Sequence, residues 1–299
     1  MKTLKYIIPI LLVSLFSCSS NENETDATGV FEATEVIVSA EASGKILFFH
    51  IQEGDELQKN QALGQIDSTQ LYLNKLQVEA NQIAILSSRP DIQSQLDALD
   101  REIEKAAFEK KRIEKLLKGD VATQKQLDDI DAQIEVLRAN RKAKKTSLNI
   151  STRAIDAQSA ALEAQVDLIN DQLRRSKILS PIDGTVLVKY AEEGELTAMG
   201  KPLFKVADMD RMILRAYVTA DQLPEIKTGQ TVKVLAEFGK EGNREYEGKI
   251  TWISSKSEFT PKTIQTQDER ANLVYAVKIA VQNDGDLKIG MYGGIIITK

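Results

Sequence analysis

The sequence is poor in the residues that build most catalytic and metal centres, with one cysteine and one histidine among 299 residues. A zinc site made of several His and Cys ligands is therefore excluded, and so is a disulfide within the chain. There is also no excess of basic residues, because 39 Lys and Arg stand against 44 Asp and Glu. A chain of net charge −5 has little with which to displace counterions from phosphate, so we predict that nucleic acid is not a partner.

Glycine, proline and aromatic residues are scarce through the middle of the chain. Between residues 64 and 181 there is one proline, Pro90, and one glycine, Gly119. Phe108 is the only aromatic residue between residues 72 and 190. More than a hundred residues with so few breakers of regular structure predict long helices.

Apolar residues in this part recur at alternating steps of three and four, which is the pattern of a coiled coil. Before Gly119 the seam consists of Ile92, Leu96, Leu99, Ile103, Ala106, Ile113 and Leu117, with Lys110 as a polar member. After it the seam consists of Leu127, Ile130, Ile134, Leu137 and Leu148, with Arg141 and Lys144 as polar members. Gly119 is expected at the C′ position of the first helix, and Thr123 with Gln126 predicts a capping box that begins the second. A short turn requires antiparallel helices, so the sequence predicts a helical hairpin with its tip at residues 118–123.

Each arm of this hairpin carries a candidate break at a similar distance from the tip. Residues 87–90 end in Pro90, which disfavours helix in the residue before it, and residues 149–152 can cap a new helix. We therefore expect a base pair of helices at about 69–87 and 153–177 below a distal pair. The predicted base contact places Leu73, Leu76, Ala80 and Ile83 against Leu162, Val166, Ile169 and Leu173.

The first residues have the organisation of a secretory signal. A basic start is followed by an apolar stretch, Tyr6–Phe16, that is shorter than the roughly 20 residues of a membrane-spanning helix. The run Leu15-Phe16-Ser17-Cys18 resembles a bacterial lipobox, whose cysteine is diacylated and becomes the new N-terminus. We predict a lipoprotein signal peptide over residues 1–17, lipidation of Cys18, and a polar tether over residues 18–29. The alternative is an ordinary signal peptide with a chance cysteine.

Two segments that flank the helical part resemble each other. In residues 44–67 two glycines ten residues apart are followed nine residues later by a leucine, and residues 184–208 repeat these spacings. A repeat of this kind indicates two halves of one small β-sandwich, and the halves look like the half-motifs of a biotinyl or lipoyl domain. We predict a lipoyl-like domain split between residues 30–67, which include a preceding strand, and residues 178–208, with the hairpin of residues 68–177 inserted between its halves.

Residues 209–299 have the pattern of short strands separated by turns. The strands are expected at Met212–Val218, Thr231–Ala236, Tyr246–Ile253, Leu273–Val281 and Ile289–Ile297. Such a series indicates a small β-barrel. The predicted fold class is therefore α+β and elongated, with a split lipoyl-like β-sandwich, an inserted α-helical coiled-coil hairpin and a small β-barrel after it.

This order of domains resembles the HlyD family of periplasmic adaptors, also called membrane fusion proteins, over nearly the whole chain after Cys18. Residues 257–278 are similar to a stretch of the YbhG-like group, which is associated with ABC exporters. The run Lys288-Ile-Gly-Met291 resembles the closing barrel strand of many adaptors. The end of the chain at Lys299 leaves little room for a further membrane-proximal domain, which favours an ABC partner over a proton-driven pump.

The predicted hairpin tip contains a motif of the same family. In adaptors that dock onto a TolC-like outer-membrane channel, the tip carries an Arg-x3-Leu-x6-Ser pattern. Arg112, Leu116 and Thr123 have these spacings, with threonine in place of serine. The resemblance implies that Arg112 and Thr123 donate hydrogen bonds to the channel and that Leu116 fills a groove. Alternatively, Leu116 packs in the seam, Thr123 only caps a helix and Arg112 is a solvated charge.

The resemblance implies a non-enzymatic protein without a cofactor, held in the periplasm by a lipid in the inner membrane. It would link an inner-membrane exporter to a TolC-like channel for efflux or secretion, and it would form a homo-oligomeric ring, a hexamer in the family. Two other functions stay open: a coiled-coil scaffold of the envelope without a transport role, and a lipoyl or biotinyl carrier subunit. The carrier is disfavoured because Asp67-Ser68 leads into a helix where a carrier displays its lysine in a tight turn.

Overall fold

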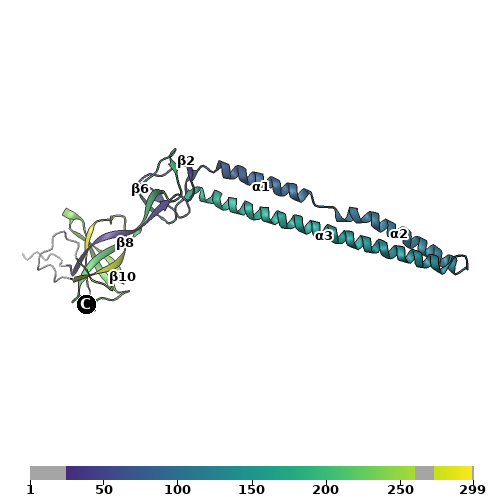
Figure 1. The fold of residues 1–299 in the computed structure, drawn as a ribbon. Helices are drawn as coiled ribbons and strands as arrows, with labels where there is room; N and C mark the ends of the chain where they lie inside the picture. Colours follow the sequence, from purple (N-terminus) through teal and green to yellow (C-terminus); the bar gives the residue numbers. More distant parts are fainter. Residues whose placement is uncertain (1–24, 260–272, 298–299) are drawn as a thin grey trace, which may run out of the picture.

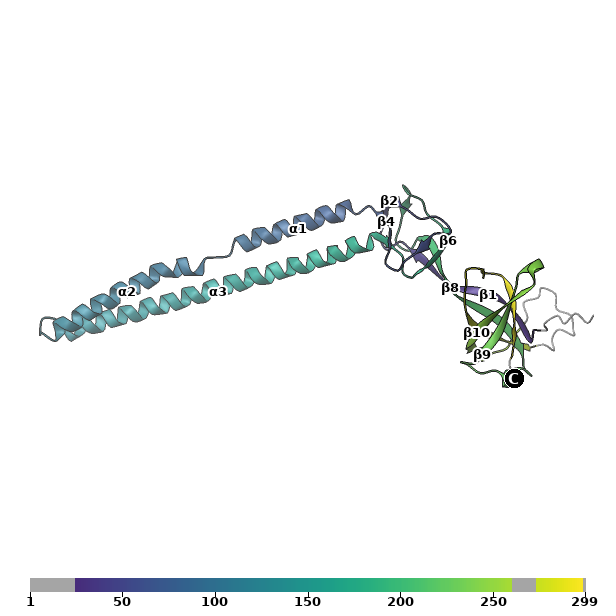
Figure 2. The same ribbon diagram turned by 180° about the vertical axis from the view of Figure 1, so that it is seen from behind.

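The computed structural model describes residues 25–259 and 273–297, which form three bodies in a row (Figure 1). A β-barrel lies at one end, a small β-sandwich lies in the middle, and a long helical hairpin projects from the sandwich. The view from behind shows the same order, with α1 and α2 forming one arm of the hairpin and α3 the other (Figure 2). The elongated α+β fold predicted from the sequence is confirmed.

The sandwich contains two copies of one strand pattern. The first copy is β2 (Gly44–Phe49), β3 (Glu56–Leu57) and β4 (Ala62–Ile66), and the second is β6 (Gly184–Lys189), β7 (Leu196–Thr197) and the start of β8 (Pro202–Thr219). Strand β5 (Lys177–Leu179) pairs with β4. The copies exchange their short strands, since β3 pairs with β6 and β7 pairs with β2. Gly54 and Gly194 stand at equivalent turns with φ of 95° and 89°, a conformation that favours glycine. Because each half supplies a strand to the other, the sandwich forms only when both halves are present.

Six strands close the barrel in a ring. In order around it they are β1 (Ala27–Ser39), the second part of β8, β12 (Leu273–Gln282), β10 (Asn243–Ile253), β9 (Thr231–Glu237) and β13 (Tyr292–Ile296), which pairs again with β1. The short strand β11 (Glu258–Phe259) pairs with β12, and single 3₁₀ turns occupy Leu223–Glu225 and Gly239–Glu241. Phe31, Leu214 and Ile279 are fully buried in the interior, because alternate residues of each strand point inward.

Strand β1 belongs to both the barrel and the sandwich. Its first residues, Ala27–Val30, pair with β13, and its pairing with β8 continues as far as Ser39. The strand therefore begins inside residues 18–29, which we predicted as a tether, and residues 209–299 do not close the barrel without it. The prediction also placed the last strand too early, because Lys288–Met291 precede β13 as a turn. A strand whose partners lie far along the chain leaves no local signal of where it belongs.

The hairpin consists of α1 (Thr69–Ser87), α2 (Ile92–Leu117) and α3 (Gln124–Arg175). The predicted break at Pro90 is confirmed, because α1 ends at Ser87 and Asp91 caps α2. The predicted break at residues 149–152 is wrong, since α3 runs through it without interruption. These residues include no proline, and the Thr152 hydroxyl donates to the Leu148 carbonyl oxygen at 3.0 Å, so it bonds within the helix instead of ending it.

The coiled-coil seam between α2 and α3 is confirmed. Its buried members are Leu96, Ala106, Ile134 and Leu148. Two of the polar members form ion pairs across the seam: Lys110 Nζ lies 2.6 Å from Asp131 Oδ1, and the Arg141 guanidinium binds the Asp100 carboxylate. The third, Lys144, is exposed. Polar seam residues are thus accommodated where an opposite charge stands at the same height on the other helix.

The predicted contact face of α1 is wrong. Helix α3 turns its predicted stripe inward, and Leu162, Val166, Ile169 and Leu173 are all buried or half-buried. Helix α1 turns inward the stripe that contains Leu71, Val78 and Gln82, whereas Leu73, Leu76 and Ile83 are 51%, 43% and 68% exposed. Both faces of α1 carry apolar residues at heptad spacing, so the sequence alone does not decide which of them meets α3.

The Asp100–Arg141 pair makes the hairpin sensitive to acid. Hydrogen bonds from Arg141 hold the pKa of Asp100 below its usual value. The stabilisation by this pair is therefore fully present above the unfolded carboxyl pKa of about 3.9, and it is lost as pH falls through the lower folded pKa. We expect thermal melts of the helical circular dichroism signal to drop less steeply below pH 4 in Asp100→Asn than in the unchanged chain. Asp97→Asn, a matched exposed position on α2, should leave the profile as it is; equal profiles for all three chains would contradict this assignment.

Part of the sequence predictions falls outside the residues that the structure describes. Residues 1–24 hold the signal peptide, Cys18 and most of the tether, and residues 260–272 hold most of the stretch that resembles the YbhG-like group. These assignments stay predictions. Among the helices that the structure does describe, none has both the length and the apolar character required to cross a lipid bilayer.

Candidate docking site at the hairpin tip

Backbone hydrogen bonds close the turn after α2. The Val121 amide donates to the Leu116 carbonyl oxygen at 3.0 Å, and the Asp120 amide donates to the Leu117 carbonyl oxygen at 3.1 Å. This pair of bonds is the Schellman ending of a helix, which needs one residue with positive φ. That residue is Asp120, with φ of 55°, and not Gly119 as the sequence suggested. Asp tolerates this conformation better than most residues with a side chain, so the turn forms with the cap one residue later.

Thr123 caps the first turn of α3. Its Oγ1 accepts a hydrogen bond from the Gln126 amide at 3.4 Å, and the Gln126 Oε1 accepts one from the Thr123 amide at 2.8 Å. The predicted capping box is confirmed. Because Thr123 is exposed, its hydroxyl can also reach a partner, and the cap and a docking contact are compatible.

Arg112 and Leu116 present their side chains to solvent beside this turn. The Arg112 side chain is 68% exposed and lies 3.8 Å from the Glu109 carboxylate, while Leu116 is 38% exposed. Residues four apart are neighbours on one helix face, so these two form a single surface. Leu116 is more exposed than a seam residue, because the seam position at the end of α2 is the half-buried Leu117. Leu117, and not Leu116, therefore occupies the seam position at the end of α2, and the docking role of Leu116 stays a prediction.

Val121 is a further apolar residue of the tip that the motif did not include. It is 75% exposed, although it is a β-branched apolar residue within a tight turn. Together with Leu116 it gives the tip two exposed apolar side chains. Its position between the turn residue Asp120 and the cap Thr123 is the signal by which the sequence could have revealed it.

The exposed groups of the tip are of the kinds that form contacts between proteins. The tip offers an exposed guanidinium that donates to carbonyl or carboxylate oxygens, one hydroxyl, and two apolar side chains that can enter a groove. Among the residues that the structure describes, the only histidine is His50 in the turn after β2 of the sandwich, at the other end of the hairpin. Within residues 25–259 and 273–297, no three His, Cys, Asp or Glu side chains gather in a way that could hold a metal ion.

The capping role of Thr123 can be measured apart from any partner. We expect Thr123→Ala to lower the local stability of the first turn of α3 by about 1 kcal/mol, because it leaves an amide of that turn without its acceptor. Thr123→Ser should retain the cap. The readout is the hydrogen-exchange rate of the Gln126 amide. The control is Thr146→Ala in the helix interior. There the threonine hydroxyl donates to the Lys142 carbonyl oxygen at 3.0 Å, and alanine is a better helix former than threonine. If Thr146→Ala destabilised α3 as much as Thr123→Ala does, the capping assignment would be contradicted.

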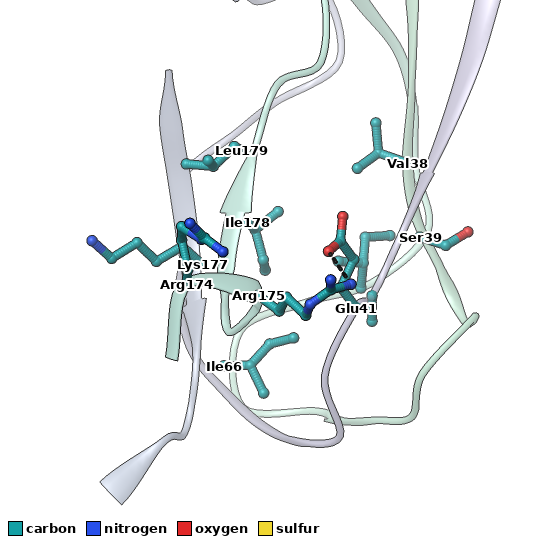
Figure 3. Close-up of a pocket in the computed structure, with 11 residues that line it drawn as sticks. Val38, Ser39, Glu41, Ile66, Arg174, Arg175, Lys177, Ile178 and Leu179 are labelled. Atoms are coloured by element: carbon teal, nitrogen blue, oxygen red, sulfur yellow. Dashed lines mark ion pairs between the residues drawn. The ribbon is translucent and has the colours of Figure 1, made fainter. Parts of the chain in front are cut away.

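Charged residues fix the other end of the hairpin to the sandwich. Figure 3 shows Arg175 at the end of α3 beside Glu41, with 3.6 Å between Nη1 and Oε2. The same guanidinium lies 2.7 Å from Asp171 through Nε, and hydrogen bonds from Arg175 and Arg174 lower the pKa of Asp171. Ile66 and Ile178 line the small cavity beside this pair, about 170 Å³ in volume. The cavity lies at the joint between hairpin and sandwich, because its lining comes from the last residues of α3 and from strands of the sandwich.

Comparison with protein families gives one match that covers most of this architecture. The family described as "RND MFP, barrel-sandwich hybrid domain", where MFP stands for membrane fusion protein, matches residues 34–209. That range includes both halves of the sandwich and the entire hairpin.

Relatives and solved structures extend the similarity to nearly the whole chain. A UPF0194 membrane protein of Yersinia enterocolitica is 27% identical over 319 aligned residues, which cover 96% of each chain. One of Acidithiobacillus ferridurans is 23% identical over 88% of this chain and 83% of its own. The crystal structure of MacA from Actinobacillus actinomycetemcomitans superposes with a TM-score of 0.55 at 23% identity, over 90% of this chain and 76% of that one. A MacA–MexA chimera with the Pseudomonas aeruginosa MexA α-hairpin domain gives 0.54 at 25% identity, over 91% and 80%.

Proposed function

Because this chain belongs to the RND membrane fusion protein family through its barrel-sandwich hybrid domain, we propose that it links an inner-membrane exporter to a TolC-like outer-membrane channel. Adaptors of this family are periplasmic and membrane-associated, and they work with inner-membrane transporters and outer-membrane channels in tripartite assemblies. The proposal adds that the exporter is of the ABC type, that Cys18 carries a lipid anchor in the inner membrane, and that the copies form a ring, a hexamer by family resemblance.

The observation that carries the proposal is the exposed tip at the far end of a long, regular hairpin. Helix α3 is 52 residues long without a break and therefore reaches about 78 Å. At the distal end of the hairpin, the side chains of Arg112 and Val121 are largely exposed to solvent and that of Leu116 is partly exposed. Leu116 and Val121 are apolar and exposed where α2 turns into α3, and they stand beside an exposed guanidinium. A surface of this kind is expected where the tip meets a partner.

The other parts serve the same task by position. The barrel lies at the opposite end from the tip, and the sandwich joins the two (Figure 1). Helix α3 passes into β5 of the sandwich, and the Arg175–Glu41 pair ties the hairpin base to it. The action is mechanical: the barrel and sandwich line a duct on the exporter side, and the hairpins meet the channel. No bond is broken in this mechanism.

The ABC-type partner and the lipid anchor are supported by sequence. The resemblance of residues 257–278 to adaptors of ABC exporters supports the first, and the lipobox-like run that ends at Cys18 supports the second. The carrier function has no support of this kind, because the chain passes from β4 directly into α1 at Thr69. A carrier would require a displayed lysine at that junction.

Cross-linking in intact cells tests the proposal. A photoreactive phenylalanine analogue replaces Val121 at the tip in one chain and Val136 in the other. Val136 is 59% exposed on α3, fifteen residues from Val121 and therefore about 20 Å down the hairpin. After illumination and purification, mass spectrometry should find an outer-membrane channel bound to the Val121 chain only. A mild chemical cross-link of the unchanged chain should recover the exporter.

The results separate the adaptor from an envelope scaffold. Recovery of both partners, together with loss of export on deletion and intact envelope morphology, would establish the adaptor. An equal channel signal from Val121 and Val136 would contradict docking by the tip. Envelope damage without an export defect, and no exporter in the cross-linked fraction, would favour the scaffold.

A further inference from the structure

The outward face of α1 carries a second apolar stripe that nothing in the chain covers within the described residues. Leu73, Leu76, Ala80 and Ile83 follow heptad spacing, and each lies two positions before a residue of the buried stripe. Two residues along a helix turn it by about 200°, so the two stripes lie on nearly opposite faces. Leu73, Leu76 and Ile83 are between 43% and 68% exposed. We call this set the α1 stripe.

The charge of α1 is also unlike that of a helix that faces water. Two of its nineteen residues are charged, Lys75 and Glu79, whereas twelve of the twenty-six residues of α2 are charged. The α1 stripe is flanked by Gln, Asn and Tyr side chains. At the corresponding outward positions of α2 stand Ser94, Asp97 and Arg101. A helix with apolar heptads on two faces and few charges is expected to pack against helices on both sides.

Helix α3 has a second stripe of complementary size on its own outward face. Ala157, Ala161, Ala164 and Leu168 follow heptad spacing two positions after the residues of its buried stripe, and all four are exposed. Three of the four are alanines, so another helix can approach this face closely. Large side chains facing small ones at heptad spacing are a favourable arrangement for two packed helices. We call this set the α3 stripe.

The two stripes stand at the same height on the hairpin. Gln82 of α1 donates hydrogen bonds to the carbonyl and hydroxyl oxygens of Ser159 on α3, at 3.3 and 3.2 Å, which fixes the level of the two antiparallel helices. Counting from this pair, Leu76 is level with Gln165, next to Ala164, and Leu73 is level with Leu168. A rotation about an axis parallel to the hairpin leaves the height of each residue unchanged. Because the two stripes lie at the same height on opposite sides of the hairpin, such a rotation can place the α1 stripe of one copy opposite the α3 stripe of the next.

We propose that the α1 stripe of one copy packs on the α3 stripe of a second copy, head to tail, as a second coiled-coil seam at the base of the hairpin. Each copy gives one stripe and receives the other, which is the geometry that closes into rings. The inference deepens the proposed function, which calls for a ring, and it is tested without either membrane partner. The apolar stripe ends at Pro90, because the next outward positions, on α2, are the polar or charged Ser94, Asp97, Arg101 and Glu104. Further along that face only Phe108 is apolar and exposed, so the continuous apolar contact between neighbouring hairpins lies at their base.

Cysteine pairs test the contact. The full-length chain with Leu76→Cys and Ala164→Cys, Cys18 retained, is oxidised in isolated membranes and run on a non-reducing gel. The two new cysteines point away from each other within one copy, so they can join only different copies. We expect a ladder of covalent oligomers. The matched control, Asn74→Cys with Asp167→Cys, is at the same level beside the stripes, and it should give at least about tenfold less product, since a disulfide requires Cα atoms within about 7 Å.

The single variants decide the symmetry. A head-to-tail contact predicts almost no covalent dimer from Leu76→Cys alone. A strong dimer band from that single variant would show a two-fold contact of α1 with α1 and overturn the proposal. Failure of the ladder in the double variant would overturn it as well. Neither result would affect the test at Val121, so the proposed function and this inference can fail separately.

A charge placed in the stripe gives an independent readout. Ile83→Glu should weaken self-association of the detergent-solubilised protein at least about tenfold in analytical ultracentrifugation, because it inserts a carboxylate into an apolar contact. The fold of the single chain should be unaffected, since Ile83 is 68% exposed and Glu is a good helix former. Asn74→Glu is the control. Unchanged association of Ile83→Glu, with an unchanged melting curve, would overturn the proposal.

Discussion

An Arg112→Asp chain is expected to fold normally and to lose export. The Arg112 side chain is 68% exposed and makes one ion pair of 3.8 Å with Glu109, so its replacement should change the stability of the hairpin by less than about 0.5 kcal/mol. In the docked state that we propose, the same position faces the channel. An arginine that anchors an interface contributes about 2 kcal/mol or more, which corresponds to about thirtyfold in affinity. Charge reversal should therefore reduce both channel recovery after cross-linking and export by at least about tenfold.

Arg101→Asp is the matched control for this experiment. Arg101 is exposed on α2 eleven residues before Arg112, so it lies on nearly the same helix face about 17 Å nearer the base. It should retain export and channel recovery. The exporter should be recovered from both variants, because the tip is remote from the barrel. An equal loss of export and channel recovery in the two variants, or an unchanged channel signal in Arg112→Asp, would contradict the tip assignment and favour the envelope scaffold.

Phe31→Ala is expected to give the largest loss of stability. Phe31 is fully buried in the barrel, its amide donates to the Met291 carbonyl oxygen at 2.8 Å, and its carbonyl oxygen accepts from the Gly290 amide at 2.8 Å. Removal of a buried phenyl ring costs about 3–5 kcal/mol, because the cavity that remains collapses only in part. For a barrel of this size the apparent Tm should fall by about 10 °C or more.

Ile37→Ala is the control on the same strand. It shows whether the loss of stability comes from the buried side chain of Phe31 or from any truncation in β1. Ile37 is 55% exposed where β1 passes through the sandwich, so its truncation should change the free energy of unfolding by less than about 0.5 kcal/mol. Calorimetry of the two variants is the measurement. The helical signal of the hairpin should melt at an unchanged temperature in both, unless barrel and hairpin unfold together. A Phe31→Ala barrel as stable as that of Ile37→Ala would show that β1 does not close the barrel.

The elements that local patterns specify were predicted well. The heptads of α2 and α3 place the seam correctly, since steps of three and four identify one helix face whatever surrounds it. The capping box of Thr123 and Gln126 marks the start of α3 because its two hydrogen bonds join residues three apart. The repeated glycine spacing marks the two sandwich halves. The motif proposed Arg112 and Leu116, and the exposure of Val121 in the structure added a third candidate.

The errors arose where two local solutions were both possible. Residues 149–152 can cap a helix or continue one, and a long helix already formed on both sides favours continuation. In the tip turn Gly119 and Asp120 can each adopt positive φ, and the chain uses Asp120. On α1 either of two apolar stripes could pack against α3. In each case local sequence permits both states, and contacts from elsewhere select one.

The sequence by itself determined most of the helices and strands, because helix caps, heptads and glycine turns depend on residues a few positions apart. It also determined the class of the fold, since a repeat split by a hairpin allows few arrangements. Only the tertiary structure decided that β1 completes the barrel, that the sandwich halves exchange β3 and β7, and that Leu73, Leu76 and Ile83 face outward. These features depend on pairing and packing between distant segments, 77 residues apart for Gln82 and Ser159 and more than a hundred for the strand pairs, and no short pattern in the chain carries that information.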